Sequence, residues 1–460
     1  MKKEQLELLK QLAGDNNYLT DPSECIAYSY DNSRFQGTPL AVIFGRSTDQ
    51  ISKLIKFCHD EKIIIYCRGK GSATTGASVP TSPGIVLSLE KMNQIKTLDV
   101  ENRVMVVEPG VTNEAVQIAA NQKGFFWAPD PSSASTCTIG GNLACNAAGP
   151  RAVKYGSTRD NVLGLTAVTG AGEIINTGVY TTKGVVGFDL TRLLIGSEGS
   201  LAVITQANLK LLPLAEAKTT LRAIYTNLNE CTKAIAAIMN QGIIPCALEF
   251  IDEAAINTIT DYTRVDIPKQ AKALLMIEVE GLQSELPQLA QKIIDTAKNP
   301  GLLEINAAKS KQEVEELWKM RKALSPALKK VAPKKINEDV VVPVSNLPEF
   351  IAFTHDLMND YSIKIVNFGH SGNGNIHVNI LLDPADSTQA KDAEICLEKI
   401  FDKVLALKGT LSGEHGIGMD KRDYILKELD PNALKLMHQI KAIFDPANIM
   451  NPDKVLPNLG

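Results

Sequence analysis

Two of the chain's six histidines, His370 and His377, lie in the glycine-rich stretch GHSGNGNIHVNI. The run from Ile376 to Leu382 alternates in polarity, which predicts a strand with His377 and Asn379 on the same face. The glycine loop before this run can fold His370 back beside His377. Two imidazoles that converge in this way predict a site for zinc, iron or manganese, each of which usually needs a third protein ligand.

A candidate for the third ligand lies in LSGEHGIG, where glycines flank the pair Glu414 and His415. A carboxylate at this position could reach across to the two histidines. The alternative is that His370 and His377 only hydrogen-bond to backbone, but their glycine-rich surroundings favour the metal or catalytic role. The other three histidines lie on predicted helices and are expected to be structural: His59, His355 and His438.

The glycine-rich loop RGKGSATTGASVP follows a strand-like run from Ile63 to Cys67. At such a position, backbone N–H groups often bind the phosphates of a nucleotide. The glycine spacing does not match the G-x-G-x-x-G fingerprint of NAD-binding folds, and the lysine of a P-loop is missing after Gly76. NAD enzymes and P-loop ATPases are therefore disfavoured. A pyrophosphate held by glycine backbone and by hydroxyl groups suits the loop better.

A second segment, APDPSSASTCTIGGNLACNAAGP from Ala128 to Pro150, contains almost no bulky side chains. Such a run cannot build a core, and loops of this length are uncommon unless they are functional. The alternative is a plain surface loop. Together with the first glycine loop, the segment predicts backbone that lies against a flat ligand.

The overall composition fits a soluble globular protein of two or three domains. The chain has 460 residues, of which 44% are hydrophobic and 22% charged, and its net charge of −4 gives no reason to expect nucleic acid. Eight cysteines without a C-x-x-C pair indicate a reducing compartment and argue against an iron–sulfur cluster bound by this chain alone. With neither a signal peptide nor a membrane span in the sequence, we expect a cytoplasmic location.

Two textures divide the chain near Pro213. Before it, short apolar runs and glycines predict a mixed α+β domain, with a helix that begins at Ser47 and a turn at Gly170 to Gly172. After it, strands alternate with long helices, which predicts an antiparallel sheet with helices on one side and a helical C-terminal tail. The helices expected in this second part span residues 229–241, 284–298, 310–329, 346–361 and 389–407.

The first half resembles a known flavoprotein domain. RGKGSATTG, DPSSASTCTIGGNLACNAAG, YGSTRDNVLGLTAV and LLIGSEGSLAVIT are similar, in this order, to the FAD-binding domain of the vanillyl-alcohol oxidase type. The first loop has no histidine to anchor the flavin, which implies non-covalent FAD. The resemblance implies that FAD is bound by Arg68, Gly69, Lys70, Gly71, Ser72, Ala73, Thr74, Gly76, Pro129, Ser132, Thr138, Gly140, Gly141, Asn142, Cys145, Gly149, Glu198, Ile204 and Asn451.

The second half extends the resemblance. WKMRKALSPAL, EDVVVP, GHSGNGNIHVNI, SGEHGIG and NPDKVLP resemble FAD-dependent D-2-hydroxy acid dehydrogenases, the group that acts on D-lactate, glycolate and D-2-hydroxyglutarate. The resemblance implies that Arg321 binds the substrate carboxylate and that His415 is the catalytic base. It further implies a divalent metal, zinc, manganese or iron, on His370, His377 and Glu414. Further substrate contacts are expected from Ser325, Asn379 and Lys335, although Asn337 aligns with the substrate-binding lysine of some relatives.

These motifs imply three regions. Residues 1–213 are expected to form the FAD-binding domain, residues 214–415 the substrate or cap domain with the metal site, and residues 416–460 a helical segment packed back near the flavin. The expected reaction is oxidation of a D-2-hydroxy acid, D-lactate being favoured, to the 2-oxo acid. Without a nicotinamide fingerprint or cluster motif, the expected electron acceptor is a protein, such as an electron-transfer flavoprotein, an iron–sulfur subunit, a quinone-linked carrier or a cytochrome.

Four alternatives stay open at this point. The substrate could instead be glycolate or D-2-hydroxyglutarate. An aryl alcohol is a further possibility, in which case replacing Arg321 would leave activity intact. The chain could also be a non-catalytic flavin subunit of a larger oxidase, although such a subunit should have lost the metal and carboxylate-binding residues. A metal-dependent hydrolase leaves the first half of the chain unexplained.

Overall fold

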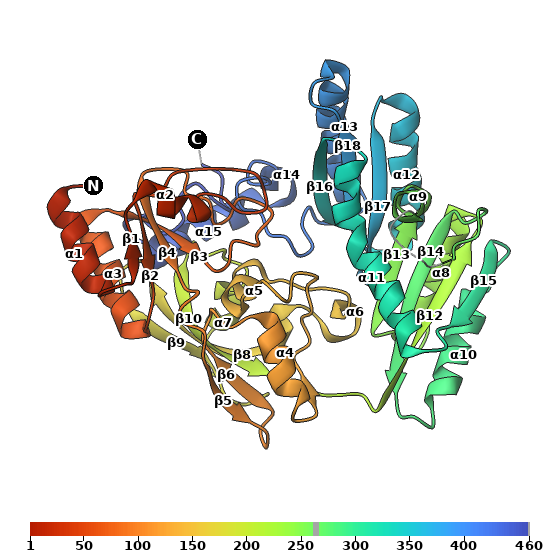
Figure 1. The fold of residues 1–460 in the computed structure, drawn as a ribbon, viewed down its shortest axis with the longest axis horizontal. Helices are drawn as coiled ribbons and strands as arrows, with labels where there is room; N and C mark the ends of the chain where they lie inside the picture. Colours follow the sequence, from red (N-terminus) through yellow and green to blue (C-terminus); the bar gives the residue numbers. More distant parts are fainter. Residues whose placement is uncertain (261–265, 459–460) are drawn as a thin grey trace. The chain divides into compact units, whose positions relative to one another are not determined.

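The computed structural model describes residues 1–260 and 266–458 (Figure 1). The chain divides into two compact units. Unit 1 comprises Met1–Gly149, Gly156–Leu214 and Glu414–Gly460, and unit 2 comprises Pro150–Tyr155 and Ala215–Gly413. Within the described ranges, no helix combines the length and the apolar character needed to cross a membrane.

Unit 1 is built on two main sheets. The first places β2, β4 and β3 in parallel, with β1 antiparallel at the edge. The second is antiparallel throughout, and its hairpin of β8 and β9 turns at Gly170 to Gly172 as the sequence predicts. The strands, in spatial order, are β1 (Tyr18–Leu19), β2 (Ala41–Phe44), β4 (Gly84–Ser88) and β3 (Ile64–Arg68), then β5 (Ile95–Asp99), β6 (Val104–Val107), β10 (Ala202–Lys210), β8 (Val162–Thr169) and β9 (Ile174–Gly178). A small third sheet pairs β7 (Phe125–Phe126) with β11 (Leu212–Pro213).

The helix predicted to begin at Ser47 is α3 (Thr48–Glu61). The Ser47 hydroxyl accepts the N–H of Gln50 at 3.2 Å, which caps the helix. The Gln50 side chain accepts the N–H of Arg46 and not that of the N-cap residue Ser47, so the second hydrogen bond of a capping box is shifted by one residue toward the N-terminus. The helix buries Ile51, Leu54, Ile55 and Cys58 against the first sheet, at the spacing that predicted it.

The C-terminal residues complete unit 1. The predicted helical tail consists of α14 (Ile425–Glu428) and α15 (Pro431–Phe444). After α15 the chain returns to the first sheet, where Met450 forms a parallel bridge with Ile65 of β3. The remaining helices of the unit are α1 (Lys3–Ala13), α2 (Pro22–Cys25), α4 (Asn113–Asn121), α5 (Ile139–Cys145) and α7 (Leu190–Leu194).

Unit 2 contains one seven-stranded sheet, and every pairing in it is antiparallel, as predicted. Its two edge strands, β15 and β16, were not predicted, because charged and polar residues interrupt their apolar pattern. Polar edge strands are common because they discourage pairing with other chains. In spatial order the strands are β15 (Leu302–Ala307), β12 (Ala217–Tyr225), β14 (Ala273–Gly281), β13 (Ala247–Asp252), β17 (Lys364–His370), β18 (Asn375–Leu382) and β16 (Lys334–Val341).

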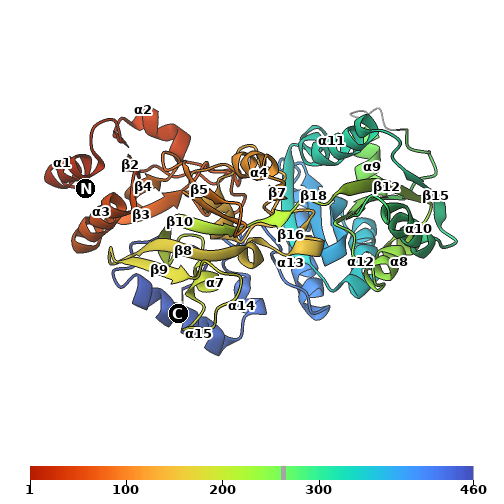
Figure 2. The same ribbon diagram turned by 90° about the horizontal axis from the view of Figure 1, so that it is seen from below.

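Helices cover both faces of this sheet, so the prediction of helices on one side is wrong (Figure 2). On one face α9 (Glu253–Ile259) and α11 (Lys311–Ala327) pack against a core that includes Ile224. The next residue of β12, Tyr225, points to the other face, where its hydroxyl donates to the carbonyl of Ala297 in α10 (Leu286–Ala297) at 2.8 Å. The continuous apolar run ALLMI of β14 already carried this information, since strands buried on both faces lose their alternation.

The helices predicted in the second half are present, and their bounds differ from the expected ones by one or two residues. Besides α10 and α11 they are α8 (Leu228–Met239), α12 (Leu347–Asp360) and α13 (Ser387–Ala406). The short helix α6 (Ala152–Tyr155) also belongs to unit 2, although the chain on both sides of its segment lies in unit 1. Lys154 and Tyr155 both bond to the carboxylate of Glu280 in β14, Lys154 at 2.8 Å, which attaches the segment to the sheet.

Candidate active site

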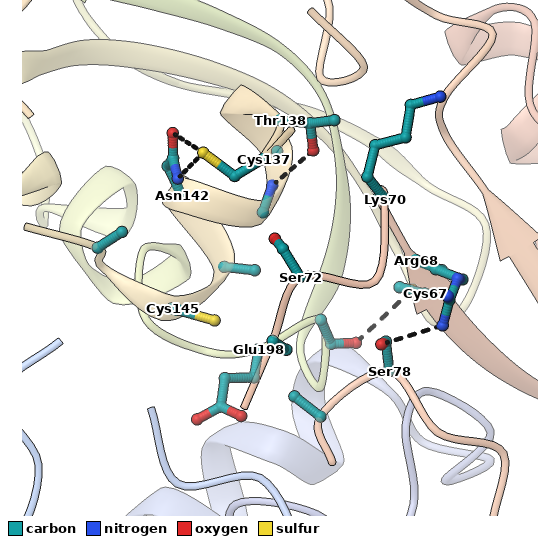
Figure 3. A pocket seen from close by; sticks show the side chains of 18 of the residues that line it. Cys67, Arg68, Lys70, Ser72, Ser78, Cys137, Thr138, Asn142, Cys145 and Glu198 are labelled. Carbon is teal, nitrogen blue, oxygen red and sulfur yellow. Dashed lines mark hydrogen bonds between the residues drawn. The ribbon is translucent and has the colours of Figure 1, made fainter. Parts of the chain in front are cut away.

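Unit 1 contains a cavity of about 310 Å³ (Figure 3). The glycine loop after β3 forms one wall, and the second small-residue segment with α5 forms another. Further lining comes from the stretch between Leu194 and Ile204 and from the pair Glu414 and His415. The motifs that are far apart in the sequence therefore border one space.

Most of the residues expected at FAD border this cavity. They are Arg68, Gly69, Lys70, Gly71, Ser72, Ala73, Thr74, Ser132, Thr138, Gly140, Gly141, Asn142, Cys145, Glu198 and Ile204. Gly76, Pro129, Gly149 and Asn451 are not among the lining residues. The Asn451 side chain is buried instead, where it accepts the N–H of Cys67 at 3.0 Å and donates to the Glu198 carbonyl at 2.6 Å.

The two basic residues of the glycine loop are engaged with the protein. Arg68 donates to the carbonyls of Tyr30 at 2.8 Å and Ala27 at 3.1 Å. Lys70 forms an ion pair with Glu90 at 2.9 Å. A diphosphate at this loop would therefore rely mainly on backbone N–H groups and hydroxyls, as the sequence suggested.

Glu198 connects the cavity to the segment that follows His415. The residue has the left-handed φ of 50°, and its carboxylate accepts the N–H of Ile417 at 2.6 Å and of Gly418 at 2.8 Å. Burial raises the pKa of Glu198 to about 7, although the two N–H donors favour its charged form. The carboxylate thus holds the backbone just after His415 at the cavity wall.

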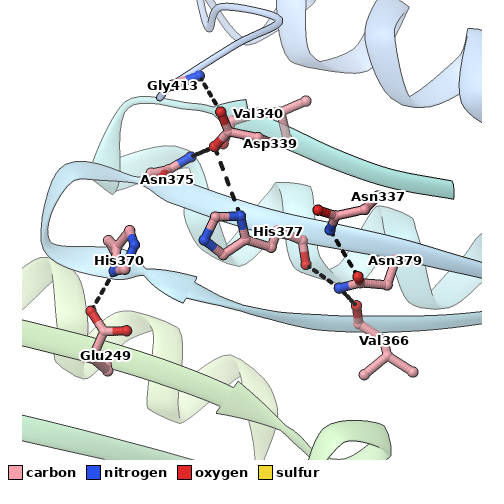
Figure 4. Close-up of polar contacts among 10 residues, drawn as sticks. All are labelled: Glu249, Asn337, Asp339, Val340, Val366, His370, Asn375, His377, Asn379 and Gly413. Atoms are coloured by element: carbon pink, nitrogen blue, oxygen red, sulfur yellow. Dashed lines mark hydrogen bonds and ion pairs between the residues drawn. The ribbon is translucent and has the colours of Figure 1, made fainter. Parts of the chain in front are cut away.

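In unit 2, His370 ends β17 and His377 lies on β18, and their ring centroids are 5.3 Å apart (Figure 4). The loop between them turns at Gly374, whose φ is +76°. A Cβ there would lie 1.8 Å from the Val342 carbonyl oxygen, so only glycine fits. The loop brings the two histidines together as the sequence predicts.

Glu249 of β13 joins His370 to Arg321, a link the sequence reasoning missed. Its Oε1 lies 2.7 Å from His370 Nδ1, and its Oε2 accepts Arg321 Nε–H at 2.7 Å. Burial alone would raise the pKa of Glu249, but the charges of His370 and Arg321 hold it below its ordinary value. A glutamate inside the apolar run ALEFI was the available signal, because a buried carboxylate needs partners.

Asp339 of β16 has a corresponding position beside His377. Its Oδ1 lies 3.8 Å from His377 Nδ1 and accepts the Asn375 amide at 2.6 Å. Its Oδ2 accepts the N–H of Gly413 at 3.0 Å, the residue immediately before Glu414 (Figure 4). Each histidine thus has a buried carboxylate beside one ring nitrogen, the arrangement usual for metal-binding histidines.

Comparison with known proteins identifies the family. Residues 39–178 match the FAD binding domain, and residues 214–455 match the family described as FAD linked oxidases, C-terminal domain. The chain belongs to the FAD-linked oxidases. The glycolate oxidase subunit GlcD of Bacillus subtilis is 38% identical over 98% of this chain and 96% of its own length. The D-lactate dehydrogenase of Archaeoglobus fulgidus is 33% identical over 94% of this chain and 96% of its own.

Solved structures support the fold of this FAD-linked oxidase. The structure of p-cresol methylhydroxylase matches with a TM-score of 0.80 at 17% sequence identity, and the match covers 99% of this chain and 97% of that of p-cresol methylhydroxylase. Alkyldihydroxyacetonephosphate synthase has a TM-score of 0.74 at 18% identity, with coverage of 98% and 85%. The vanillyl-alcohol oxidase type of fold predicted from the motifs is therefore confirmed. The family match and the relatives show that the protein is a flavin-dependent oxidoreductase.

The cavity of the oxidase fits FAD at its glycines. Gly69 is required by the protein itself, since a Cβ there would lie 2.5 Å from Thr138 Oγ1. Gly141 is not: its φ is not positive, and a Cβ would meet only Thr138 Oγ1 at 3.4 Å, which is ordinary contact. The absence of a side chain at Gly141 leaves this part of the cavity wall open to a ligand.

The proposed substrate contacts differ in their surroundings. Lys335 donates to Ser325 Oγ at 2.9 Å, which brings these two predicted residues together. Asn379 is fully buried, accepts from Asn337 at 2.8 Å and donates to the carbonyls of Val366 and His377. Its amide is hydrogen-bonded inside the sheet, and its contact with the substrate stays a prediction.

Proposed function

We propose that this FAD-linked oxidase converts a D-2-hydroxy acid to the 2-oxo acid, with D-lactate as the favoured substrate. One observation carries the proposal: Glu249 holds Arg321 and the metal-ligand candidate His370 on adjacent sides of a single carboxylate. A cation for a carboxylate group and a metal for a hydroxyl group on the neighbouring carbon are what a 2-hydroxy acid requires. The names of relatives such as D-lactate dehydrogenase support the same class.

Arg321 is proposed to bind the substrate carboxylate. It is nine-tenths buried on α11, and its guanidinium lies over the Phe368 ring at 4.9 Å, so its orientation is fixed before substrate arrives. A planar guanidinium can bind a carboxylate through two parallel hydrogen bonds, which sets the plane of the substrate. Ser325 and Lys335 are proposed as further contacts with the substrate.

His415 is proposed to accept the proton from O2 of the substrate. It borders the same cavity as the glycine loop, and the Glu198 contacts hold the backbone that follows it. Oxidation removes one proton from O2 and one hydride from C2. The cavity-lining residues would hold FAD, which would supply the acceptor for that hydride.

A divalent metal is proposed on His370, His377 and Glu414. The support is the pair of adjacent imidazoles, the carboxylate beside each of them, and the bond from Gly413 to Asp339 that fixes the backbone before Glu414. The metal would supply charge that lowers the pKa of the 2-hydroxyl group.

FAD is proposed to bind without a covalent link. Burial raises the pKa of Cys67 to about 12 and raises that of Cys145 further, so both cavity thiols stay protonated and are poor nucleophiles. Reoxidation is proposed to occur through a protein acceptor, an electron-transfer flavoprotein or an iron–sulfur subunit. The sequence has neither a C-x-x-C pair nor a dinucleotide fingerprint that would suggest an internal route.

Glycolate is the second candidate, because the Bacillus subtilis relative is named as a glycolate oxidase subunit. The test is the anaerobic flavin spectrum of the purified, metal-loaded protein before and after addition of D-lactate, L-lactate, glycolate or D-2-hydroxyglutarate. Bleaching by D-lactate and not L-lactate is the expected result. Bleaching only by glycolate would favour the second candidate, and bound flavin that no hydroxy acid bleaches would reject the proposal.

A further inference from the structure

Glu249 is the centre of a buried polar link across three elements of unit 2. It lies on β13 directly opposite His370 of β17 in the antiparallel register, with its side chain fully buried. Residues opposed in this way project from the same face of the sheet and are close enough for direct contact. The third member, Arg321, comes from α11, which packs on this face.

The two oxygens of Glu249 have separate partners. Oε1 lies 2.7 Å from His370 Nδ1, which directs the opposite ring nitrogen, Nε2, away from Glu249. Oε2 accepts Arg321 Nε–H at 2.7 Å, which leaves the end of the guanidinium formed by Nη1 and Nη2 for a ligand. The contact with His370 therefore determines that Nε2 is the ring nitrogen available to a metal, and the contact with Arg321 determines that Nη1 and Nη2 are the atoms available to a substrate carboxylate.

Phe368 contacts two of the neighbouring side chains, Arg321 and His377. The Arg321 guanidinium lies 4.9 Å from the centroid of its ring, and the His377 ring lies 5.7 Å from it. Phe368 and His377 are also directly opposed on β17 and β18. The Glu249 carboxylate and the Phe368 ring thus link both histidines and the arginine in one cluster of contacts.

We propose that Glu249 is a positioning residue that sets the distance between the carboxylate-binding group Arg321 and the metal-binding histidine His370. The inference rests on the proposed function and deepens it. A fixed spacing selects substrates whose carboxylate and hydroxyl are on adjacent carbons, and it disfavours 3-hydroxy acids, in which a further carbon separates them. Glu249 itself contacts neither substrate nor metal.

The test compares Glu249→Gln with a matched control, Glu278→Gln. Glu278 is a buried carboxylate on the next strand, β14, and it also bonds to α11, through Trp318 Nε1 at 2.8 Å, but it contacts neither Arg321 nor His370. Equilibrium dialysis with Zn²⁺ alone measures metal affinity. Anaerobic flavin reduction by D-lactate and by D-3-hydroxybutyrate, over a range of concentrations, measures substrate affinity and discrimination.

Glu249→Gln is expected to lower Zn²⁺ affinity roughly 10-fold to 100-fold. It should also raise the D-lactate concentration that gives half-maximal flavin reduction, and it should reduce the preference of the enzyme for D-lactate over D-3-hydroxybutyrate. Glu278→Gln should leave all three unchanged. Suppose that the wild type binds Zn²⁺ and is bleached by D-lactate. If Glu249→Gln and Glu278→Gln then have equal Zn²⁺ affinity, D-lactate affinity and substrate preference, the inference is overturned while the proposed function stands. Failure of the wild type to bleach rejects the proposed function instead, and the Zn²⁺ affinities still test the link to His370.

A second variant covers the case in which Glu249→Gln does not fold. Glu249→Asp keeps the charge but is one methylene shorter, so it cannot reach both partners at once. It should retain one function and lose the other, either Zn²⁺ affinity or D-lactate affinity. Full retention of both by Glu249→Asp would contradict the shared role.

Discussion

The carboxylate of Asp339 accepts the backbone N–H of Gly413 through Oδ2 and lies beside His377 through Oδ1. The Asp339 side chain therefore orients His377, a candidate metal ligand, and also holds the backbone immediately before Glu414. Asp339→Asn replaces one of the two acceptor oxygens by an NH2 group, so either the bond from Gly413 or the bond from Asn375 is lost. We expect Zn²⁺ affinity to fall roughly 10-fold to 100-fold, measured by equilibrium dialysis. The control is Asp252→Asn, an equally buried carboxylate of the same sheet that caps α9, for which an equal loss of Zn²⁺ affinity would contradict the role of Asp339.

Gly141 separates flavin binding from protein stability. Gly141→Ala places a methyl group in the cavity and at the same time improves the helix propensity of α5 by up to about 1 kcal/mol. We expect the flavin-free protein to be as stable as wild type or more so, while FAD affinity falls. Thermal unfolding and fluorescence titration with FAD measure the two effects. The control is Gly242→Ala, whose Cβ would meet nothing within 4 Å, and FAD affinity should be unchanged in this variant. Unchanged FAD affinity in Gly141→Ala would show that FAD does not reach Gly141.

Glu198 predicts a pH dependence of stability. Its folded pKa of about 7 lies above the ordinary 4.5, so between these values the folded carboxyl keeps a proton that the unfolded one loses. Stability from this group is present below about pH 4.5 and declines as pH rises to 7, by at most about 3 kcal/mol. Glu198→Gln lacks this titration, so its Tm relative to wild type should rise between pH 5 and pH 8. The exposed-site variant Asp99→Asn should give a constant difference over that range, since the pKa of Asp99 is already below its ordinary value.

Arg321→Ala tests the carboxylate grip. Removal of a buried, hydrogen-bonded charge partner costs about 2–5 kcal/mol, so the second-order rate of flavin reduction by D-lactate should fall roughly 30-fold or more. Lys319→Ala, an exposed lysine on the same helix, should reduce flavin at the wild-type rate. Undiminished reduction by D-lactate in Arg321→Ala would show that Arg321 does not bind the substrate carboxylate.

Metal removal should separate the two cofactors. Dialysis against a chelator is expected to leave the flavin spectrum in place, because of the three proposed metal ligands only Glu414 borders the flavin cavity. Bleaching by D-lactate should be lost and then restored by Zn²⁺ or Mn²⁺. Bleaching that persists after chelation, at full rate and without detectable metal, would exclude a role for the metal.

The sequence predicted what depends on short-range pattern. Glycine spacing and polarity alternation were enough for the loop around Gly374, the pairing of His370 with His377 and the antiparallel sheet. The missed carboxylates, Glu249 and Asp339, belong to ordinary strands, and their partners come from other strands and from α11. Such partners depend on register between strands far apart in the sequence, which local periodicity does not encode. The two edge strands were missed for a different reason, since their polar residues obscured the strand pattern.

The division of the chain into units also sets the order in which their residues are completed during synthesis. Residues of unit 2 end at Gly413, and the segment around α6 joins its sheet from earlier in the chain, so all residues of this unit are synthesised before the last segment of unit 1. In unit 1, Cys67 bonds to Asn451, 384 positions later. Contacts over such separations close a long loop and form slowly. The flavin cavity is bordered by Glu414 and His415, so its lining is complete only after every residue of unit 2 has been synthesised.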